Sequence, residues 1–159
     1  MFHAKTNIVL TGFMGSGKST VGRLLARRLG RPFVDMDAEI EQRAGKAIAA
    51  IFAEEGEAAF RRLEAGLCRE LATKAGLVIA TGGGALTFAE NRETLARNGL
   101  LICLDVTPNS VLQRLTGRDD RPLLAAEDRR ARVEALLAQR AAAYGAIPHH
   151  ILTDGLTVA

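Results

Sequence analysis

The eight residues GFMGSGKS, at positions 12–19, decide the fold of this chain. They match the pattern G-x-x-x-x-G-K-[ST], which requires a strand before it and a helix after it. An apolar run at 8–10 precedes the motif, and an amphipathic run at 21–29 follows it. Glycines let backbone N–H groups turn inward, and a helix N-terminus carries roughly half a positive charge. The motif therefore predicts a loop that holds phosphate groups between a strand and a helix.

The rest of the chain continues the same alternation of strands and helices. Its apolar runs are near-continuous rather than alternating, which is typical of strands buried on both faces of a parallel sheet. The predicted strands are 8–10, 32–34, 77–80, 100–104 and, more weakly, 150–152. Two helical stripes between them are Val21, Leu24, Leu25 and Leu29, and Phe60, Leu63, Leu67 and Leu71. We therefore predict a three-layer α/β/α fold with a five-stranded parallel sheet.

Composition excludes several classes of protein. The 159 residues, 48% hydrophobic and 25% charged, predict one soluble globular domain covering 1–159. Cys68 and Cys103 lie in apolar patterns and are predicted to be buried thiols of a reducing compartment. With no expected signal peptide and no apolar run long enough to span a bilayer, a cytoplasmic location without membrane contact is predicted. A net charge of +3 with only 4% aromatic residues favours an anionic small molecule over nucleic acid.

Two charged segments lack a strand signal. The segment at about 36–64 is helical, and TGRDDRPLLAAED, at 116–128, combines glycine, proline and charges. We expect the first to form a substrate-binding lobe and the second to form a mobile lid over the site.

Two carboxylates follow the second predicted strand. Asp35 and Asp37 come at the carboxyl end of that strand, the edge where α/β sheets bind ligands. In an extended segment their side chains alternate, so one could face a metal ion and the other a substrate hydroxyl. Asp37 could instead cap a helix that begins at Ala38. Asp105 also follows a strand, but the chain turns directly into a helix at Thr107-Pro108, so we assign it an edge-of-sheet role.

Three consecutive glycines, Gly82, Gly83 and Gly84, follow the third predicted strand in the stretch VIATGGGAL, 78–86. A glycine inside ordered structure is less favourable than alanine by roughly 0.5–1 kcal/mol. A tight turn explains one or two of them. A third indicates that the backbone must approach a small polar ligand closely.

Arginines occur at positions where an apolar residue or a loop is expected. Arg140 lies on the apolar stripe of a helix predicted at Arg132–Tyr144, so it needs an anion or must reach solvent. Arg61 follows Phe60, and Glu64 one turn later could orient it. Arg114 and Arg121 flank the predicted lid, and lid arginines of phosphoryl-transfer enzymes contact the transferring phosphate.

Together these motifs resemble the shikimate kinase family, which belongs to the nucleoside-monophosphate-kinase-like branch of P-loop proteins. The matching stretches stand in the family's order and spacing from the first strand to about Tyr144. They are GFMGSGKST, DMD, IFAEEGEAAFRRLE, ATGGGA, TGRDDRPLL and LAQRAAAY. The resemblance implies transfer of the γ-phosphate of ATP to the 3-hydroxyl of shikimate, with Mg²⁺ as cofactor.

The resemblance also implies roles for individual residues. Those expected at ATP are Gly15, Ser16, Gly17, Lys18, Ser19, Thr20, Arg114 and Arg121, with Ser19 and Asp35 at Mg²⁺. Those expected at shikimate are Asp37, Arg61, Gly83, Gly84 and Arg140, with Phe52, Phe60 and Pro122 lining the ring. Lys18, Asp37 and Arg121 are the expected catalytic residues. The family pattern continues past the last strand into a further helix, for which this sequence has no counterpart.

Two alternatives stay open at this point. One is a kinase for another small acceptor, such as gluconate or a nucleotide, although the arginines and glycines favour a carboxylate on a compact ring. The other is a nucleotide-binding module without catalysis. A monomer is expected in either case.

Overall fold

A single parallel sheet organises the chain in a computed structural model that describes residues 3, 5–115 and 129–157. Its strand order is β2-β3-β1-β4-β5, and each neighbouring pair is parallel. The strands are β1 (Asn7–Gly12), β2 (Phe33–Asp35), β3 (Val78–Ala80), β4 (Gly99–Asp105) and β5 (His149–Leu152). The predicted five-stranded parallel sheet is confirmed.

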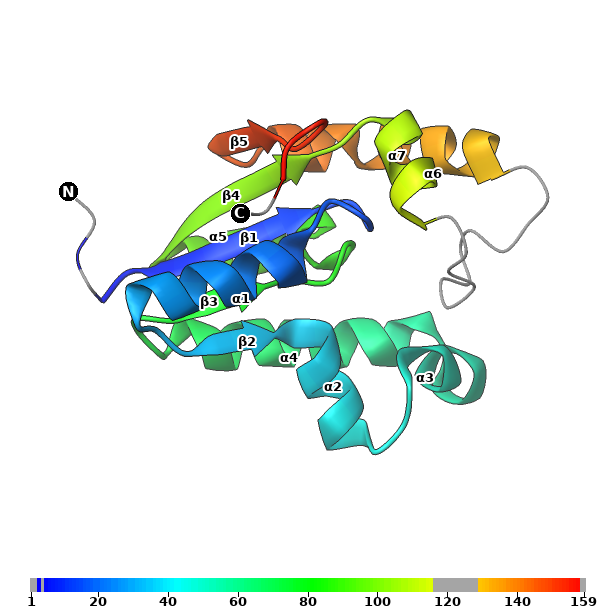
Figure 1. The fold of residues 1–159 in the computed structure, drawn as a ribbon. Helices are drawn as coiled ribbons and strands as arrows, with labels where there is room; N and C mark the ends of the chain where they lie inside the picture. Colours follow the sequence, from blue (N-terminus) through cyan, green and yellow to red (C-terminus); the bar gives the residue numbers. More distant parts are fainter. Residues whose placement is uncertain (1–2, 4, 116–128, 158–159) are drawn as a thin grey trace.

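Helices cover the sheet on both faces and complete the three layers (Figure 1). The helix α1 (Lys18–Leu29) lies on one face, and α4 (Glu57–Ala72), α5 (Ala89–Ala96) and α7 (Arg129–Gly145) lie on the other. The remaining elements are α2 (Met36–Ala44), α3 (Ile48–Glu55), the short 3₁₀ helix η1 (Ala85–Thr87) and α6 (Pro108–Leu115). Thr107 begins α6 as predicted, since its Oγ1 accepts a hydrogen bond from the Ser110 amide (3.4 Å).

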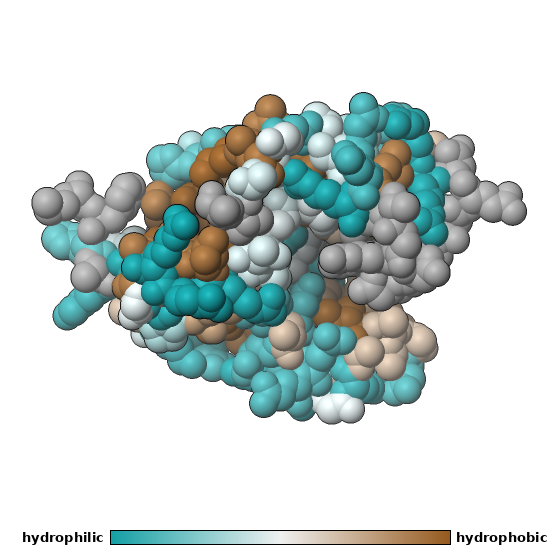
Figure 2. All heavy atoms as spheres, viewed as in Figure 1, coloured by the Kyte–Doolittle hydropathy of each residue, from teal (hydrophilic) through white to brown (hydrophobic). Residues whose placement is uncertain are grey.

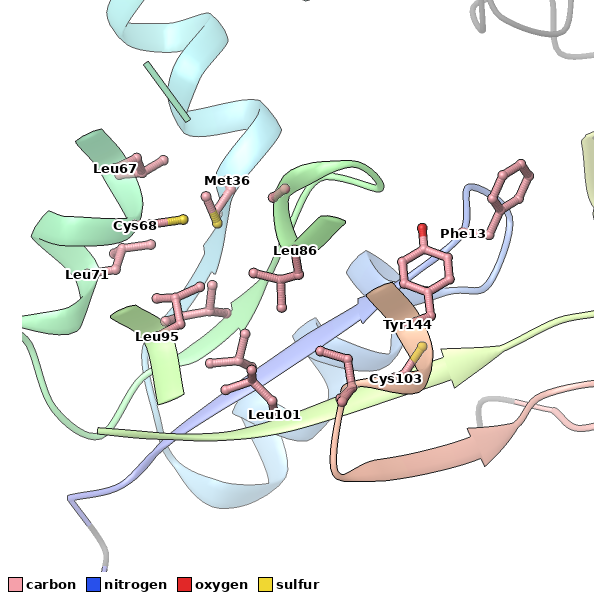
Figure 3. Close-up of a cluster of buried hydrophobic side chains, with 14 of the residues drawn as sticks. Phe13, Met36, Leu67, Cys68, Leu71, Leu86, Leu95, Leu101, Cys103 and Tyr144 are labelled. Carbon is pink, nitrogen blue, oxygen red and sulfur yellow. The ribbon is translucent and has the colours of Figure 1, made fainter. Parts of the chain in front are cut away.

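The main hydrophobic core lies between the sheet and the layer of α4, α5 and α7, as Figure 3 shows. Leu71, Leu95 and Leu101 are among its buried members, and the two cysteines lie among them. Burial raises the pKa of the Cys68 and Cys103 thiols to about 12, so both stay protonated at neutral pH. Both are free, as predicted.

The predicted helical stripes are only partly correct. In α1 the fully buried residues are Gly22 and Ala26, whereas Leu29 is 48% exposed. Gly22 is buried because the Phe33 ring packs directly on it: a Cβ there would lie 2.5 Å from Phe33 Cε2. In α4, Leu63 was predicted to lie on the buried stripe, but it is 45% exposed. The next residue, Glu64, is buried instead, because its carboxylate pairs with Arg61.

The fold brings the carboxyl ends of all five strands to one side of the molecule, the right side in Figure 1. The lobe of α2, α3 and the start of α4 lies below that edge in the same view, and α6 and α7 lie above it. The predicted motifs that the structure describes therefore meet at one place. Among the described helices, none combines the length and the hydrophobicity that crossing a bilayer requires.

Candidate active site

A large cleft opens at the carboxyl ends of the strands. It encloses about 1800 Å³ and is lined by the phosphate loop, α2, α3, α4, the triple glycine and α7. The hollow opens on the face drawn in Figure 2, between the sheet and the lobe of α2 and α3. Sites for one small molecule usually measure about 300–1,000 Å³, so this cleft has room for two ligands side by side.

The phosphate loop connects β1 to α1, as the motif predicted. Gly12 and Gly17 adopt positive φ angles of 142° and 94°, which other residues rarely adopt. A Cβ on Gly12 would also lie 2.5 Å from the carbonyl oxygen of Leu104. Lys18 curls over the loop, where its Nζ donates to the carbonyl oxygens of Gly12 (2.7 Å) and Phe13 (3.1 Å). The ammonium group therefore lies above the amides that would face phosphate.

The other residues predicted at ATP lie in different surroundings. Gly15, Gly17, Ser19 and Thr20 line the cleft. Ser16 is buried beneath the loop, and its amide donates to the carbonyl of Phe13. Its Oγ is buried without a hydrogen-bond partner among the described residues.

Arg114 lines the same cleft from α6 and ties three parts of the chain together. Its Nη1 donates to the carbonyl of Gly15 (2.9 Å) and to Thr153 Oγ1 (3.0 Å), and its Nη2 donates to the carbonyl of Thr153 (2.7 Å). The segment that follows β5 is thus fastened to the phosphate loop.

Ser19, in the first turn of α1, and Asp35, at the end of β2, bring two oxygen atoms together. Ser19 Oγ donates to Asp35 Oδ2 at 2.6 Å, and both residues line the cleft. Asp35 Oδ1 accepts from the Ala38 amide (3.2 Å) and so caps α2. The suggestion that Asp37 caps this helix is therefore wrong. The prediction that Asp37 lies in an extended segment is also wrong. Asp37 lies in the first turn of α2, which turns its side chain into the cleft.

Each glycine of the triple faces a charged side chain. A Cβ on Gly82 would lie 2.6 Å from Asp37 Oδ1, and one on Gly83 would lie 3.3 Å from Arg140 Nη1. A Cβ on Gly84 would lie 2.8 Å from Arg61 Nη2. None of the three has a positive φ. Their absent side chains, rather than their backbone freedom, let Asp37, Arg140 and Arg61 converge on one backbone segment.

The two arginines are held differently. Arg140 is only 9% exposed, its guanidinium lies 5.5 Å from the centre of the Phe13 ring, and its Nη1 is buried without a hydrogen-bond partner among the described residues. Arg61 lies near the rings of Phe60 and Phe88, and its Nη1 donates to Glu64 Oε1 at 2.8 Å. A buried donor that lacks an acceptor is unfavourable, so Arg140 is suited to bind an anion in the cleft.

Comparison with known proteins agrees with this geometry. The family model described as shikimate kinase matches residues 14–159. A shikimate kinase of Pelotomaculum thermopropionicum is 47% identical over 152 residues, which cover 96% of this chain and 88% of that one. One of Symbiobacterium thermophilum is 51% identical over 151 residues, 93% of this chain and 87% of that one.

The chain belongs to the shikimate kinase family. A solved structure agrees: shikimate kinase from Acinetobacter baumannii in complex with shikimate superposes with a TM-score of 0.91 at 41% identity. The likeness covers 99% of this chain and 88% of that one. The predicted family and fold are thereby confirmed.

Two residues of this shikimate kinase family member, Tyr144 and Arg92, were not predicted as part of the site, whereas Glu64 holds Arg61 as predicted. Glu64 is 1% exposed; burial raises the pKa of its carboxyl, and the Arg61 guanidinium opposes that shift. Tyr144 donates its hydroxyl to the carbonyl of Gly83 (2.6 Å), and burial raises the pKa of that hydroxyl. Arg92 lines the cleft and donates to the carbonyl of Leu86 (2.9 Å).

Other predicted residues are not among those that line this cleft in the described part of the chain. Arg121, Pro122 and the predicted lid at 116–128 fall outside the described residues, so their roles stay predictions. Asp105 ends β4 but does not line the cleft; its carboxylate contacts His150 instead. The edge strand is β5 rather than β4, so Asp105 lies one strand in from the predicted edge and reaches it through His150.

Replacing Gly84 with alanine should weaken the binding of the acid substrate and leave the binding of ATP unchanged. The added Cβ would lie within 3 Å of both Arg61 Nη atoms, which forces the guanidinium to move without disturbing the backbone. A lost charge-assisted hydrogen bond corresponds to an increase of about 10- to 100-fold in the KM for shikimate. Steady-state kinetics with each substrate varied in turn measure the effect. Gly145→Ala is the matched control, since its Cβ would meet nothing within 4 Å. Equal loss for both substrates would contradict the assignment.

Proposed function

We propose that this protein transfers the γ-phosphoryl group of ATP to the 3-hydroxyl of shikimate, giving shikimate 3-phosphate and ADP. The observation that supports this most strongly is the convergence of Asp37, Arg61 and Arg140 on three bare glycines beside a phosphate loop. The relative from Acinetobacter baumannii, whose structure contains shikimate, shares the fold over nearly the whole chain.

The phosphate end of the cleft would hold ATP through the loop amides of residues 15–20 and through Lys18. In the described geometry the Lys18 ammonium is held by two carbonyl oxygens of the loop. Phosphate oxygens would replace these acceptors. The positive charge of Lys18 would then stabilise the phosphoryl group as it is transferred, in line, to the attacking hydroxyl. Arg121 is proposed as a second cation on that group, and Arg114 is proposed to lie near the adenine.

The residues at the end of β2 fit Mg²⁺. This ion prefers oxygen ligands and keeps several waters, and Ser19 Oγ and Asp35 Oδ2 offer two oxygens 2.6 Å apart in the cleft. Ser19 would bind it directly and Asp35 through water. When bound with ATP, Mg²⁺ neutralises charge on the phosphate oxygens.

The acid end of the cleft would hold shikimate. Arg140 and Arg61 would bind its carboxylate, and the amides of Gly83 and Gly84 would donate to it as well. Glu64 is a positioning residue, because it holds Arg61 and lies near Asp37 across Gly82. Phe52 and Phe60 would face the ring from α3 and α4, where both line the cleft.

Asp37 is the proposed general base. Its carboxylate packs against Gly82, beside the glycines that would bind the acid and across the cleft from the phosphate loop. From there it would orient the attacking hydroxyl and accept its proton as the phosphoryl group is transferred. The segment 36–64, with α2, α3 and the start of α4, would act as the substrate-binding lobe.

Replacing Arg140 with lysine should raise the KM for shikimate by about 10- to 100-fold, because lysine keeps the charge and loses the planar fork that binds a carboxylate at two points. The KM for ATP should stay unchanged, since Arg140 faces the acid end. Arg130→Lys on the same helix is the control: Arg130 bonds Asn109 and Glu134 at the surface. An unchanged KM for shikimate in a folded Arg140→Lys variant would contradict the role.

An ADP-release assay across acceptors tests the proposed function. The protein with ATP and Mg²⁺ is given shikimate, gluconate or a nucleoside monophosphate, and the phosphorylated product is identified by mass. ADP release that depends on shikimate alone is expected. Release with another acceptor would show a different small-molecule kinase, and ATP binding without acceptor-dependent release would show a non-catalytic module.

We also propose that the protein acts as a cytoplasmic monomer without nucleic acid. The described residues of one chain bring the phosphate loop, Asp37, Arg61 and Arg140 to the same cleft. Activity that is proportional to protein concentration over a wide dilution series would agree with this.

A further inference from the structure

A second group of chemically versatile side chains lies outside the cleft, at the far edge of the sheet. Cys103 and Asp105 follow each other on the same face of β4, and Cys103 pairs in register with His150 of the edge strand β5. Their ligand atoms all lie within 4.8 Å of one another. None of the three has a part in the proposed phosphoryl transfer.

The contacts of His150 require a positively charged atom between its Nδ1 and the carboxylate of Asp105. Its Nε2 lies 2.9 Å from the carbonyl oxygen of Ile147, which can only accept, so Nε2 carries a ring proton. Its Nδ1 lies 2.9 and 3.1 Å from the two carboxylate oxygens of Asp105, which can also only accept. Nδ1 and the carboxylate therefore face each other, and either a proton or a metal ion must lie between them.

The third side chain adds a sulfur ligand to the same group. Cys103 Sγ lies 3.4 Å from Asp105 Oδ1, so a thiol joins the same carboxylate. Without metal the thiol donates a hydrogen bond to the carboxylate; a metal ion would replace that hydrogen, and the proton between imidazole and carboxylate, with bonds to all three groups. A carbonyl that fixes the far ring nitrogen is also the usual partner of a histidine that binds metal.

We propose that Cys103, Asp105 and His150 form a binding site for a zinc-class divalent cation. Thiolate, imidazole and carboxylate are the ligands that Zn²⁺ takes, and Mg²⁺ avoids the first two. Around a tetrahedral zinc these atoms would lie roughly 3.4–3.6 Å apart. The sulfur–oxygen distance fits already, and the nitrogen–oxygen distances need only a small opening of two half-exposed side chains.

Bound there, the cation would fasten the edge strand β5 to β4. The exposed faces of Asp105 and His150 provide an entry path, while Cys103 is buried beneath them. Three protein ligands leave a fourth position for water. Binding must displace the thiol proton and the proton between Nδ1 and the carboxylate, so protons are released into the buffer.

Co²⁺ serves as the spectroscopic probe of this site. The full chain is freed of metal, kept in excess Mg²⁺ to occupy the Ser19–Asp35 ligands, and titrated with Co²⁺ and then Zn²⁺. We expect a thiolate-to-cobalt charge-transfer band with the visible absorption of a four-coordinate ion, both abolished by Zn²⁺. Calorimetry in buffers of different ionisation enthalpy should report the proton release.

Single variants assign the ligands. Cys103→Ser should abolish the charge-transfer band, and His150→Gln, at a half-exposed position where the fold is not at risk, should weaken Zn²⁺ binding at least tenfold. Cys68→Ser and His149→Gln are matched controls and should leave both readouts unchanged. A band that persists without Cys103, a dissociation constant that His150→Gln does not alter, or the absence of any band with the unmodified chain would overturn the proposal and leave a protonated His150–Asp105 pair.

Discussion

Replacing Lys18 with alanine should lower kcat by at least about 10²–10³-fold, the usual effect of removing one preorganised group that stabilises charge in the transition state. The Lys18 ammonium is held over the phosphate loop by the carbonyls of Gly12 and Phe13. It is therefore close to the amides that would hold the phosphates, and needs only to exchange these two acceptors for phosphate oxygens. Initial rates with both substrates saturating measure the change, and calorimetry with shikimate alone should show unchanged binding.

Lys74→Ala is the matched control for that experiment. Lys74 pairs with Glu70 at the surface, and its carbonyl accepts from Asn7 at the opposite end of the sheet. Its replacement should leave kcat unchanged. A Lys18→Ala protein that retains the kcat of the unmodified chain would show that the loop binds nucleotide without contributing to the transfer.

Replacing Asp37 with asparagine should lower kcat by about 10²–10⁴-fold, the usual contribution of a general base. The amide keeps the shape of the side chain against Gly82 but cannot accept the proton of the attacking hydroxyl. Shikimate should still bind, because Arg61 and Arg140 are untouched. Single-turnover measurements with labelled ATP separate the chemical step from binding.

Glu39→Gln is the control for Asp37→Asn. Both residues lie in the first turn of α2, but Glu39 pairs with Arg43 (2.6 Å) and does not line the cleft. Its replacement removes one negative charge from the same turn and should leave kcat intact. If the two variants lose activity equally, the loss reflects the stability of α2 rather than catalysis.

Much of the fold could be predicted from local patterns. The loop at 12–19 needs glycine where φ is positive, and the apolar runs of β1, β3 and β4 need burial on both faces. These requirements depend on neighbours in the sequence, so they can be read without the tertiary structure. The inward position of Arg140 could be predicted in the same way, since a charge on an apolar stripe must be either paired or exposed.

The residues whose burial or role the sequence predicted wrongly depend instead on contacts with other elements. Leu63 and Leu29 satisfy helical spacing but are exposed, because spacing does not say how wide a covered face is. Glu64 is buried because Arg61, Asp37 and Gly82 surround it, and two of these come from distant segments. Asp35 rather than Asp37 caps α2, since β2 ends at Asp35, whereas alternating side chains at Asp35 and Asp37 required an extended backbone up to Asp37.

The sequence by itself determined that this chain is a parallel α/β protein with a phosphate loop, and its motifs identified the family. Short-range steric and hydrophobic preferences are enough for that. Only the tertiary structure decided why three glycines stand in a row: Asp37, Arg140 and Arg61, from α2, α7 and α4, each occupy the space that one missing side chain leaves free. Close packing between elements distant in sequence depends on their relative placement in space, which no local pattern encodes.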